Sequence, residues 1–332
     1  MVAAKAGEDQ THLRGDASMS GFDAVFVGLT ILDIAGRPVE AIPEGGGIAF
    51  VEEIRMNPAG TAAGAVMNAA KMGIKTATVA CLGDDEQGRF IIDAYQRMGI
   101  DCSMIQITNK KRTSATILPI RPNGERPALH CRGASDALFV AEEDFDKVCN
   151  ARFLHHGGTG FLKAMDQGQS ARLLAHAKKK GLTTTFDLIG PNDGTLALLK
   201  DVLPNVDYFM PSMEEAEFLS GRTDPKDIAD FFIDLGAGGC IFKWSNRGSF
   251  IRTRSVTEHL PAYKVEVSDT TGCGDSYCGG FVAGLAKGLD LIQACRLATA
   301  VSGLVATGLG SDAGVIDYES TQAFMQHAQT MD

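Results

Sequence analysis

The sequence lacks the long hydrophobic runs and the excess of basic residues that mark two broad classes of protein. No stretch of about 18 or more apolar residues occurs, so we expect no membrane partner. Lys and Arg number 31 against 41 Asp and Glu, which gives a formal net charge of −10. This acidic balance argues against non-specific binding to nucleic acid. The composition is ordinary for a globular enzyme.

The eight cysteines form no Cys-x-x-Cys pair and no Cys/His cluster with zinc spacing. Cys81 and Cys240 fall in apolar, strand-like runs, where a reduced thiol packs as a small hydrophobic residue. His155 and His156 do not predict a shared metal, because neighbouring residues of a strand point to opposite faces. These features predict a cytoplasmic protein.

The first 18 residues lack the apolar segment of a secretory signal. A second Met stands at position 19. We therefore expect residues 1–20 to be a flexible tail and residues 21–332 to form the globular domain, a length that can bury a large core.

From about residue 21, short β-rich runs alternate with helical patterns. This alternation predicts a mainly parallel central sheet with helices on both faces, a three-layer αβα sandwich. The expected strands are residues 22–29, 76–82, 153–156, 183–188, 208–210 and 240–243. The expected helices are residues 60–73, 86–98, 167–180, 213–220, 226–235, 275–287, 290–306 and 318–329.

Two stretches, residues 34–58 and 111–132, interrupt the alternation. The first is rich in Gly and Pro, and the second contains an alternating strand, a turn at residues 122–125 and a returning strand. Together they predict a small β lid over the carboxyl edge of the main sheet, where ligands of open α/β sheets bind. Such an exposed lid also predicts a homodimer formed through it.

The most informative stretch runs from Asp269 to Phe281. Tyr277, Phe281 and Leu285 recur at helical spacing, so a buried helix begins just after Asp275. Gly272, Cys273 and Gly274 then lie at the helix N-terminus, where free N–H groups and the dipole favour an anion. A carboxylate beside them suits the removal of a proton from a nucleophile. Alternatively, Asp275 only favours the first helical turn.

Two common nucleotide-binding signatures are missing. No Gly-x-x-x-x-Gly-Lys-Ser/Thr occurs, which excludes a P-loop kinase. The pair Gly272 and Gly274 lacks the third glycine of the dinucleotide-binding fingerprint.

The segment Asp269-Thr270-Thr271-Gly272-Cys273-Gly274-Asp275 resembles the C-terminal signature of the ribokinase-like (PfkB) family of sugar and nucleoside kinases. The resemblance covers about residues 22 to 315 and implies the ribokinase-like fold. It implies that Asp275 is the catalytic base and that the amides of Gly272, Cys273 and Gly274 stabilise the transferring phosphoryl group.

Two further motifs match where the family binds its acceptor. Asp33 stands at the end of the first strand region, where the family has a substrate-binding Asp, although a turn aspartate is the plain alternative. Gly60 and Thr61 open a segment that resembles the N-terminal glycine signature. Gly64 replaces the family's usual Asn, which removes a hydrogen-bonding group and predicts a larger pocket.

Two motifs match the nucleotide side. Glu215 matches the Glu of the family's Asn-x-x-Glu motif, which helps to position magnesium, while Ser212 replaces the Asn. A plain first-turn Glu is the alternative. Lys243 and Gly248 flank a turn that leads into the nucleotide site in relatives, with Ser245 in place of a Gly. Two alternatives are open for Lys243: it contacts a phosphate of ATP, or it is a solvated lysine at the end of a strand.

The remaining expected contacts come from the C-terminal loops. Thr271, Gly308 and Gly310 are predicted to border ATP. The resemblance implies that Asp269 helps to bind a monovalent cation, K+, and that Glu215 helps to position Mg2+. The K+ site is the weaker of these two expectations.

The sequence therefore predicts a phosphotransferase that moves the γ-phosphoryl group of ATP to a hydroxyl of a sugar or sugar derivative. A nucleoside kinase of the adenosine type is the first alternative, and Gly64 leaves it open. A non-catalytic sugar or nucleotide sensor is the second. The sequence does not identify the acceptor.

Overall fold

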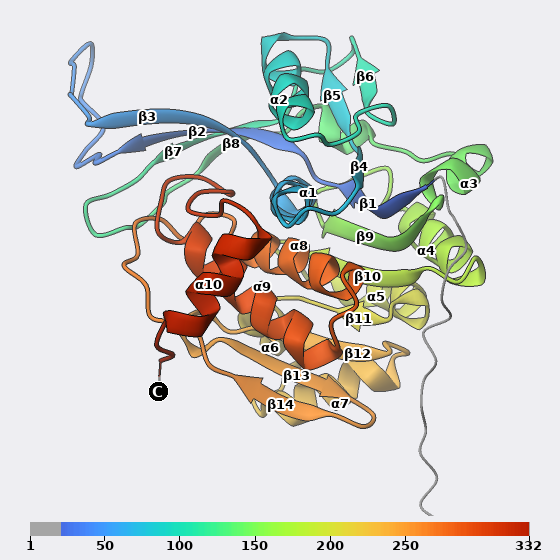
Figure 1. Ribbon diagram of the computed structural model, residues 1–332. Helices are drawn as coiled ribbons and strands as arrows, with labels where there is room; N and C mark the ends of the chain where they lie inside the picture. Colours follow the sequence, from blue (N-terminus) through green and yellow to red (C-terminus); the bar gives the residue numbers. More distant parts are fainter. Residues whose placement is uncertain (1–20, 332) are drawn as a thin grey trace, which may run out of the picture.

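A twisted eight-stranded sheet forms the middle layer of the computed structural model, which describes residues 21–331 (Figure 1). The strand order is β14-β13-β12-β11-β10-β9-β1-β4, parallel from β4 to β12, with β13 and β14 antiparallel at one edge. The strands are β1 (Phe22–Gly28), β4 (Thr76–Val79), β9 (Ala151–Thr159), β10 (Thr183–Leu188), β11 (Tyr208–Phe209), β12 (Gly239–Lys243), β13 (Ser249–Thr253) and β14 (Thr257–Leu260). The predicted tail, residues 1–20, lies outside the described residues.

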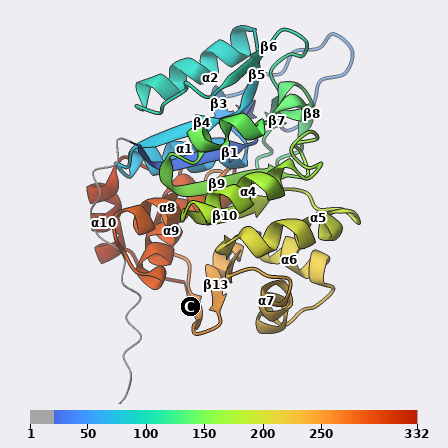
Figure 2. The same cartoon turned by 90° about the vertical axis from the view of Figure 1, so that its right-hand side faces the viewer.

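Helices cover both faces of this sheet, as Figure 2 shows. One face carries α1 (Thr61–Lys71), α8 (Cys273–Ala286), α9 (Leu291–Val305) and α10 (Tyr318–His327). The other carries α4 (Gln169–Lys179), α5 (Thr195–Val202), α6 (Met213–Ser220) and α7 (Pro225–Asp234), and the short α3 (Phe145–Val148) packs on α4. The layers predicted from the alternation of elements are confirmed. None of the described helices is long and apolar enough to cross a membrane.

Each face of the sheet has its own hydrophobic core. Along β1, Val25 and Val27 join one core, whereas Ala24 and Phe26 join the other. All four are fully buried. Side chains of a strand alternate between faces, so a strand covered on both sides reads as a continuous apolar run.

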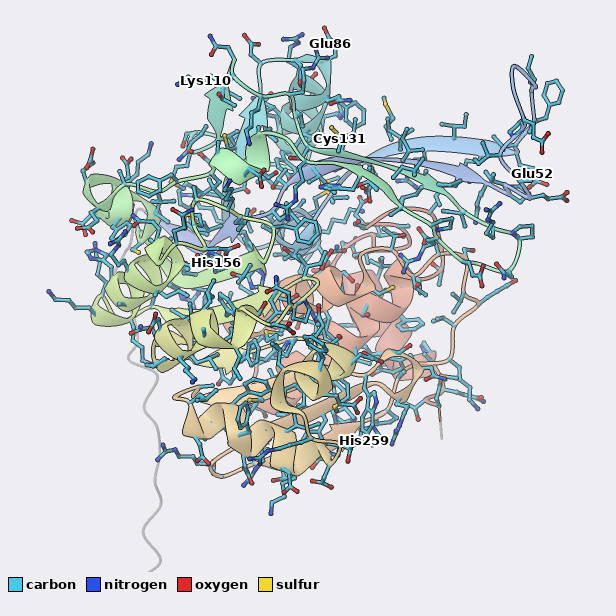
Figure 3. All side chains as sticks on the ribbon, turned by 180° about the vertical axis from the view of Figure 1, so that it is seen from behind. Glu52, Glu86, Lys110, Cys131, His156 and His259 are labelled. Atoms are coloured by element: carbon cyan, nitrogen blue, oxygen red, sulfur yellow. The ribbon has the colours of Figure 1, made fainter. Side chains whose placement is uncertain are left out.

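The lid is a separate four-stranded sheet beyond the end of the main one (Figure 1). Its strands, in the order β3-β2-β7-β8, are β3 (Glu53–Ala59), β2 (Ile31–Arg37), β7 (Ala115–Pro119) and β8 (Leu129–Cys131). The predicted turn joins β7 to β8, where the Arg121 N–H donates to the Glu125 carbonyl at 2.8 Å. Glu52 and Cys131 mark opposite ends of the lid (Figure 3).

The structure differs from the sequence-based expectation at residues 76–82. The main-sheet strand ends at Val79, and β5 (Cys81–Gly83) pairs with β6 (Gln106–Thr108) in a two-stranded sheet beside α2 (Glu86–Arg97). Both pieces are buried, so the apolar run carries no sign that the strand changes partners. The antiparallel strands β13 and β14 were also not predicted.

Candidate active site

The expected base, Asp275, lies in the first turn of α8. Gly272 caps this helix with φ +74°, and a Cβ there would lie 2.5 Å from the Cβ of Ser311, so both conformation and space require glycine. The following N–H groups have no partner within the helix and face its N-terminal end. Burial raises the pKa of the Cys273 thiol to about 12, so Cys273 contributes its amide rather than a thiolate.

The Asp275 carboxyl group lies in a poorly solvated, acidic environment. Its pKa is raised to about 6, chiefly by burial: the charge of Lys243 lowers the pKa, those of Glu215 and Asp33 raise it, and that of Arg126 lowers it. A carboxylate with a pKa near 6 is ionised at neutral pH and accepts a proton more readily than an exposed one. The group therefore has the protonation state and the basicity of a general base.

Gly64 lies directly against Asp275. A Cβ on Gly64 would be 2.7 Å from the Cβ of Asp275, so the backbone of α1 packs directly on the Asp275 side chain. The sequence predicts a larger pocket at this position, and the structure instead fills the space with Asp275 itself. One helical turn later, the Asn68 amide donates to the carbonyls of Gly64 and Ser311, each at 2.8 Å.

Asp33 lies on β2, on the lid face that looks toward α8. It is 8 % exposed, and its Oδ1 has no hydrogen-bond partner among the described residues. Burial raises its pKa to about 6, a hydrogen bond from Thr116 lowers it and the charge of Asp269 raises it. A buried carboxylate oxygen without a donor is an unfilled acceptor, and a hydroxyl group is the donor that fits it.

Asp33 belongs to a row of polar residues that strand pairing aligns across all four strands of the lid. Asn57, Asp33, Thr116 and His130 are cross-strand neighbours on β3, β2, β7 and β8. Thr116 Oγ1 and His130 Nδ1 are 3.1 Å apart. The His130 ring meets Phe161 edge-on at 5.7 Å. Sequence reasoning missed Asn57, Thr116 and His130, because only the pairing of strands far apart in the chain aligns them.

The other acceptor-side residues lie at the start of α1. Gly60 is its N-cap, and Thr61 is its first residue. Thr61 Oγ1 is buried without a partner among the described residues. It lies beside Gly157, since a Cβ there would be 3.0 Å from the hydroxyl oxygen.

Lys243, at the end of β12, lies at the α8 N-terminus. A Cβ on Gly274 would be 3.4 Å from its Nζ. Burial lowers the pKa of Lys243, but nearby carboxylates, Asp187 above all, outweigh burial and hold it above the ordinary value. The ammonium is paired with Asp187 at 2.5 Å and is only 12 % exposed. The interpretation of Lys243 as a solvated strand-end lysine is therefore wrong.

A cavity of about 250 Å³ opens on the side of α8 away from the lid. Lys243, Gly248, Cys273 and Gly274 line it, together with residues that sequence reasoning missed. The missed residues include Tyr263, Val265, Val267, Ser302 and Gly303. Thr271 and Gly310 instead line a small hollow beside Asp33, and Gly308 packs against Ala313.

Two expected metal ligands are already hydrogen-bonded. Glu215 and Ser212 form a capping box on α6, and the second Glu215 oxygen accepts the Gly190 N–H at 3.3 Å. Asp269 accepts from the N–H and hydroxyl of Thr271 and from the Gly310 N–H. No group of three or more His, Cys, Asp or Glu side chains among residues 21–331 is arranged to hold a metal ion.

The two adjacent histidines are buried in the central sheet, and neither lines the 250 Å³ cavity or the hollow beside Asp33. His155 and His156 are fully buried on β9 and hydrogen-bond to Thr185 and Ser170 on opposite sides of the sheet. Figure 3 places His156 in the body of the protein, beside α4.

Comparison with known proteins places this arrangement in one class. The sequence profile described as pfkB family carbohydrate kinase matches residues 22–317. The chain therefore belongs to the pfkB family of carbohydrate kinases, which are phosphotransferases with an alcohol group as acceptor.

Individual relatives agree with this assignment. The 2-dehydro-3-deoxygluconokinase of Bacillus subtilis is 24% identical over 299 residues, which cover 87% of this chain and 92% of the relative. An Arabidopsis thaliana ribokinase solved with ribose and ATP has a TM-score of 0.78 at 21% identity, covering 92% and 99% of the two chains. An Escherichia coli protein solved with ATP and Mg2+ gives 0.79 at 21% identity, with the same coverage. These likenesses confirm the ribokinase-like fold.

Proposed function

We propose that this protein transfers the γ-phosphoryl group of ATP to a hydroxyl group of a sugar or sugar derivative, with Asp275 as the general base. The observation that carries the proposal is the position of Asp275. Its basic carboxyl group stands at the N-terminus of α8, between the acceptor-side Asp33 and a cavity large enough for part of a nucleotide.

The acceptor would lie between the lid and the α8 N-terminus. Asp33 would accept hydrogen bonds from hydroxyl groups, since its Oδ1 has no other donor among the described residues. Asn57 and Thr116 flank it on the neighbouring strands and would contact the same molecule. The acceptor hydroxyl that faces Asp275 would be the one that reacts.

Asp275 would take the hydroxyl proton as the acceptor oxygen attacks the γ-phosphorus. The bond from that phosphorus to the oxygen of ADP breaks, and the new P–O bond joins the phosphoryl group to the acceptor. The N–H groups from Gly272 to Gly274 would stabilise the negative charge on the equatorial oxygens.

ATP would enter through the 250 Å³ cavity, with its phosphates toward Lys243 and Gly274. Support comes from the structural relatives that were solved with ATP. Mg2+ suits this site when the phosphates and water supply most of its ligands, because no described cluster of protein carboxylates is arranged to hold it alone. Glu215 would then bind through water. The K+ expectation stays a prediction, and no step uses it, because both Asp269 oxygens already accept hydrogen bonds.

A nucleoside acceptor is the second candidate, and one observation favours it. Phe161 presents an aromatic ring beside His130, at the end of the polar row that begins with Asn57. The guanidinium group of Arg132 already covers one face of that ring at 4.8 Å. A heterocyclic base would use the remaining surface, whereas a sugar needs only the polar row.

The lid also supports the proposal that two copies associate. Its outer face carries a row of cross-strand neighbours, Met56, Ile34, Ile117 and Leu129. Met56, Ile117 and Leu129 are 47%, 53% and 64% exposed, and Ile54 beside them is 70% exposed. We propose that a second copy covers this apolar row.

ADP release with a panel of acceptors tests the function. Pentoses, ketohexoses, a sugar acid and adenosine would each be supplied with MgATP, and we expect turnover with at least one sugar. Asp275→Asn should lower kcat by about 10² to 10⁴ while ATP binding stays nearly unchanged. Asp84→Asn, on the surface, is the control.

Normal turnover of Asp275→Asn would remove Asp275 as the base. Turnover with adenosine and none with the sugars would select the nucleoside alternative. Tight ligand binding without ADP release from any acceptor would support the sensor.

A further inference from the structure

Arg126 extends from the lid to the C-terminal signature. It lies in the hairpin that joins β7 to β8, and its Nη1 donates to Thr271 Oγ1 at 2.6 Å, across 145 positions of sequence. The same nitrogen is 3.8 Å from Asp269 Oδ1. A lid side chain therefore contacts the residue that precedes the N-cap of α8.

Other contacts hold the lid in this closed arrangement. Arg55 of β3 lies 3.8 Å from Asp312, and Asn57 packs against Gly310. A small apolar cluster joins Leu118 of β7 to Leu309 of the C-terminal loop. Arg126 thus reaches the signature as part of a docked lid rather than as an isolated surface contact.

The guanidinium group of Arg126 has hydrogen-bonding capacity left. A guanidinium carries five N–H donors, and the Thr271 hydroxyl uses one of them. Its nearest carboxylate, at 3.8 Å, lies beyond hydrogen-bond distance. About one third of the side chain is exposed, so the remaining donors are not all covered by protein.

The charge balance of the site requires such a group. Asp33, Asp269, Asp275 and Glu215 surround the place where the phosphates of ATP would arrive. The charge of Lys243 is already paired with Asp187. Arg126 comes from the lid, which carries Asp33, and reaches Thr271 beside the α8 N-terminus, so it joins the acceptor side to the phosphate side.

We propose that Arg126 is a catalytic residue whose guanidinium group binds the transferring phosphoryl oxygens when the lid is closed. The inference rests on the proposed phosphoryl transfer and adds a cation that belongs to the lid. Arg126 exchanges no proton: Asp275 receives the acceptor proton and ADP leaves with the bonding electrons. Because the charge arrives only with the docked lid, an open lid leaves the anion site incomplete and protects ATP from hydrolysis.

Three variants and a matched control test this role. Arg126→Ala should lower kcat by about 10², the loss typical of removing one donor from an oxyanion site. Arg126→Gln should behave similarly, and Arg126→Lys should retain part of the rate. Arg121→Ala is the control, since Arg121 lies in the same hairpin and its guanidinium group donates to the carbonyls of Val39 and Glu40, away from the α8 N-terminus. Added guanidinium chloride at millimolar concentration should partly rescue Arg126→Ala.

A binding experiment gives a readout that does not depend on turnover. Calorimetry would compare MgADP alone with MgADP plus aluminium fluoride, which mimics the transferring phosphoryl group. We expect Arg126→Ala to weaken binding of the aluminium fluoride complex by about 10² and binding of MgADP by much less. Arg126→Lys, which keeps the charge, separates this effect from a loss of folding.

Two results would overturn the inference. The first is an unchanged kcat in Arg126→Ala together with equal affinity for the aluminium fluoride complex. The second is an increase in KM of Arg126→Ala that is confined to anionic acceptors. This result would mean that Arg126 binds the acceptor and not the transferring phosphoryl group. If the proposed phosphoryl transfer itself were wrong, the wild-type protein would release no ADP with any acceptor. That outcome is distinct from both results above.

Discussion

Asp275 and Asp33 show what burial does to single residues in this site. Each is a carboxyl group whose pKa burial raises to about 6 from 3.8. The burial that makes the Asp275 carboxylate more basic also makes its ionised form unfavourable in the folded protein. In the proposed mechanism, the function of Asp275 therefore opposes the stability of the fold, and a change of pH separates the two effects.

The first prediction concerns pH. A raised folded-state pKa means that these groups favour folding below pH 4 and that this contribution is lost as the pH rises toward 6. For one such Asp the loss is at most roughly 3 kcal/mol. Asp275→Asn removes it, so we expect the variant to be more stable than wild type at pH 7 and similar to it at pH 4.

Urea unfolding of both proteins between pH 4 and 7 measures this difference, while kcat of wild type should fall below about pH 6 as Asp275 is protonated. A variant that is less stable than wild type at pH 7 would contradict the linkage.

The sequence predicted the location of a residue where a local motif specifies it, as at Asp275 and Gly272. It did not do so where the partner is remote. The sequence leaves Lys243 as either a phosphate contact or a solvated strand-end lysine, and only the structure brings Asp187 to its ammonium group. Asn57, in the Gly- and Pro-rich stretch, and Thr116, in the alternating strand, showed no sign of a shared site until strand pairing placed them beside Asp33.

At the scale of elements, the packing of α1 on α8 positions Asp275, the proposed base. The helices approach so closely that small residues are required on both. A Cβ on Gly279 of α8 would lie 2.2 Å from the Ala65 carbonyl of α1, and Gly64 meets Asp275 as described above. The sequence shows many small residues here but not which of them lie in the interface.

The second prediction separates two glycines of this interface. Gly279→Ala forces two backbones apart and should cost about 1–3 kcal/mol of unfolding free energy. Gly64→Ala displaces the Asp275 carboxyl, and we expect kcat to fall by about 10² because misplacement of about 1 Å has that effect. Gly46→Ala is the control, since a Cβ there would meet nothing within 4 Å and the position lies outside both the cavity and the hollow. Equal kcat in Gly64→Ala and wild type would contradict the contact.

Other elements show the limits of sequence patterns. The helix N-terminus at Ser212 is readable because a capping box has a local signature, and the structure contains that box. The split between β4 and β5 is not readable, since a change of sheet partner leaves hydrophobicity unchanged.

For the whole molecule, the lid has two faces of different composition, one polar and one apolar. The polar row with Asp33 faces the site, and the apolar row with Ile117 faces away from it. Successive residues of each strand point to opposite faces and so form both rows. One short sheet can therefore bind a ligand on one face and a second copy on the other, as proposed.

The third prediction concerns that second copy. The double substitution Ile117→Lys and Leu129→Lys should convert a dimer into a monomer, because two charges would be buried in the apolar row. Sedimentation equilibrium at micromolar concentration measures the change. Phe218→Lys, at an exposed apolar position on α6, should leave the dimer intact. A wild-type protein that is monomeric at these concentrations would contradict the proposal.

The sequence by itself determined the class of this protein. Its α/β alternation predicted the layers, and the stretch from Asp269 to Asp275 predicted a helix N-terminus with a base, because both are local patterns. Only the tertiary structure decided what surrounds that base. Gly64 on Asp275, Asp187 on Lys243 and Arg126 on Thr271 are contacts between distant segments. Such contacts follow from how helices and strands pack, and no local pattern encodes them.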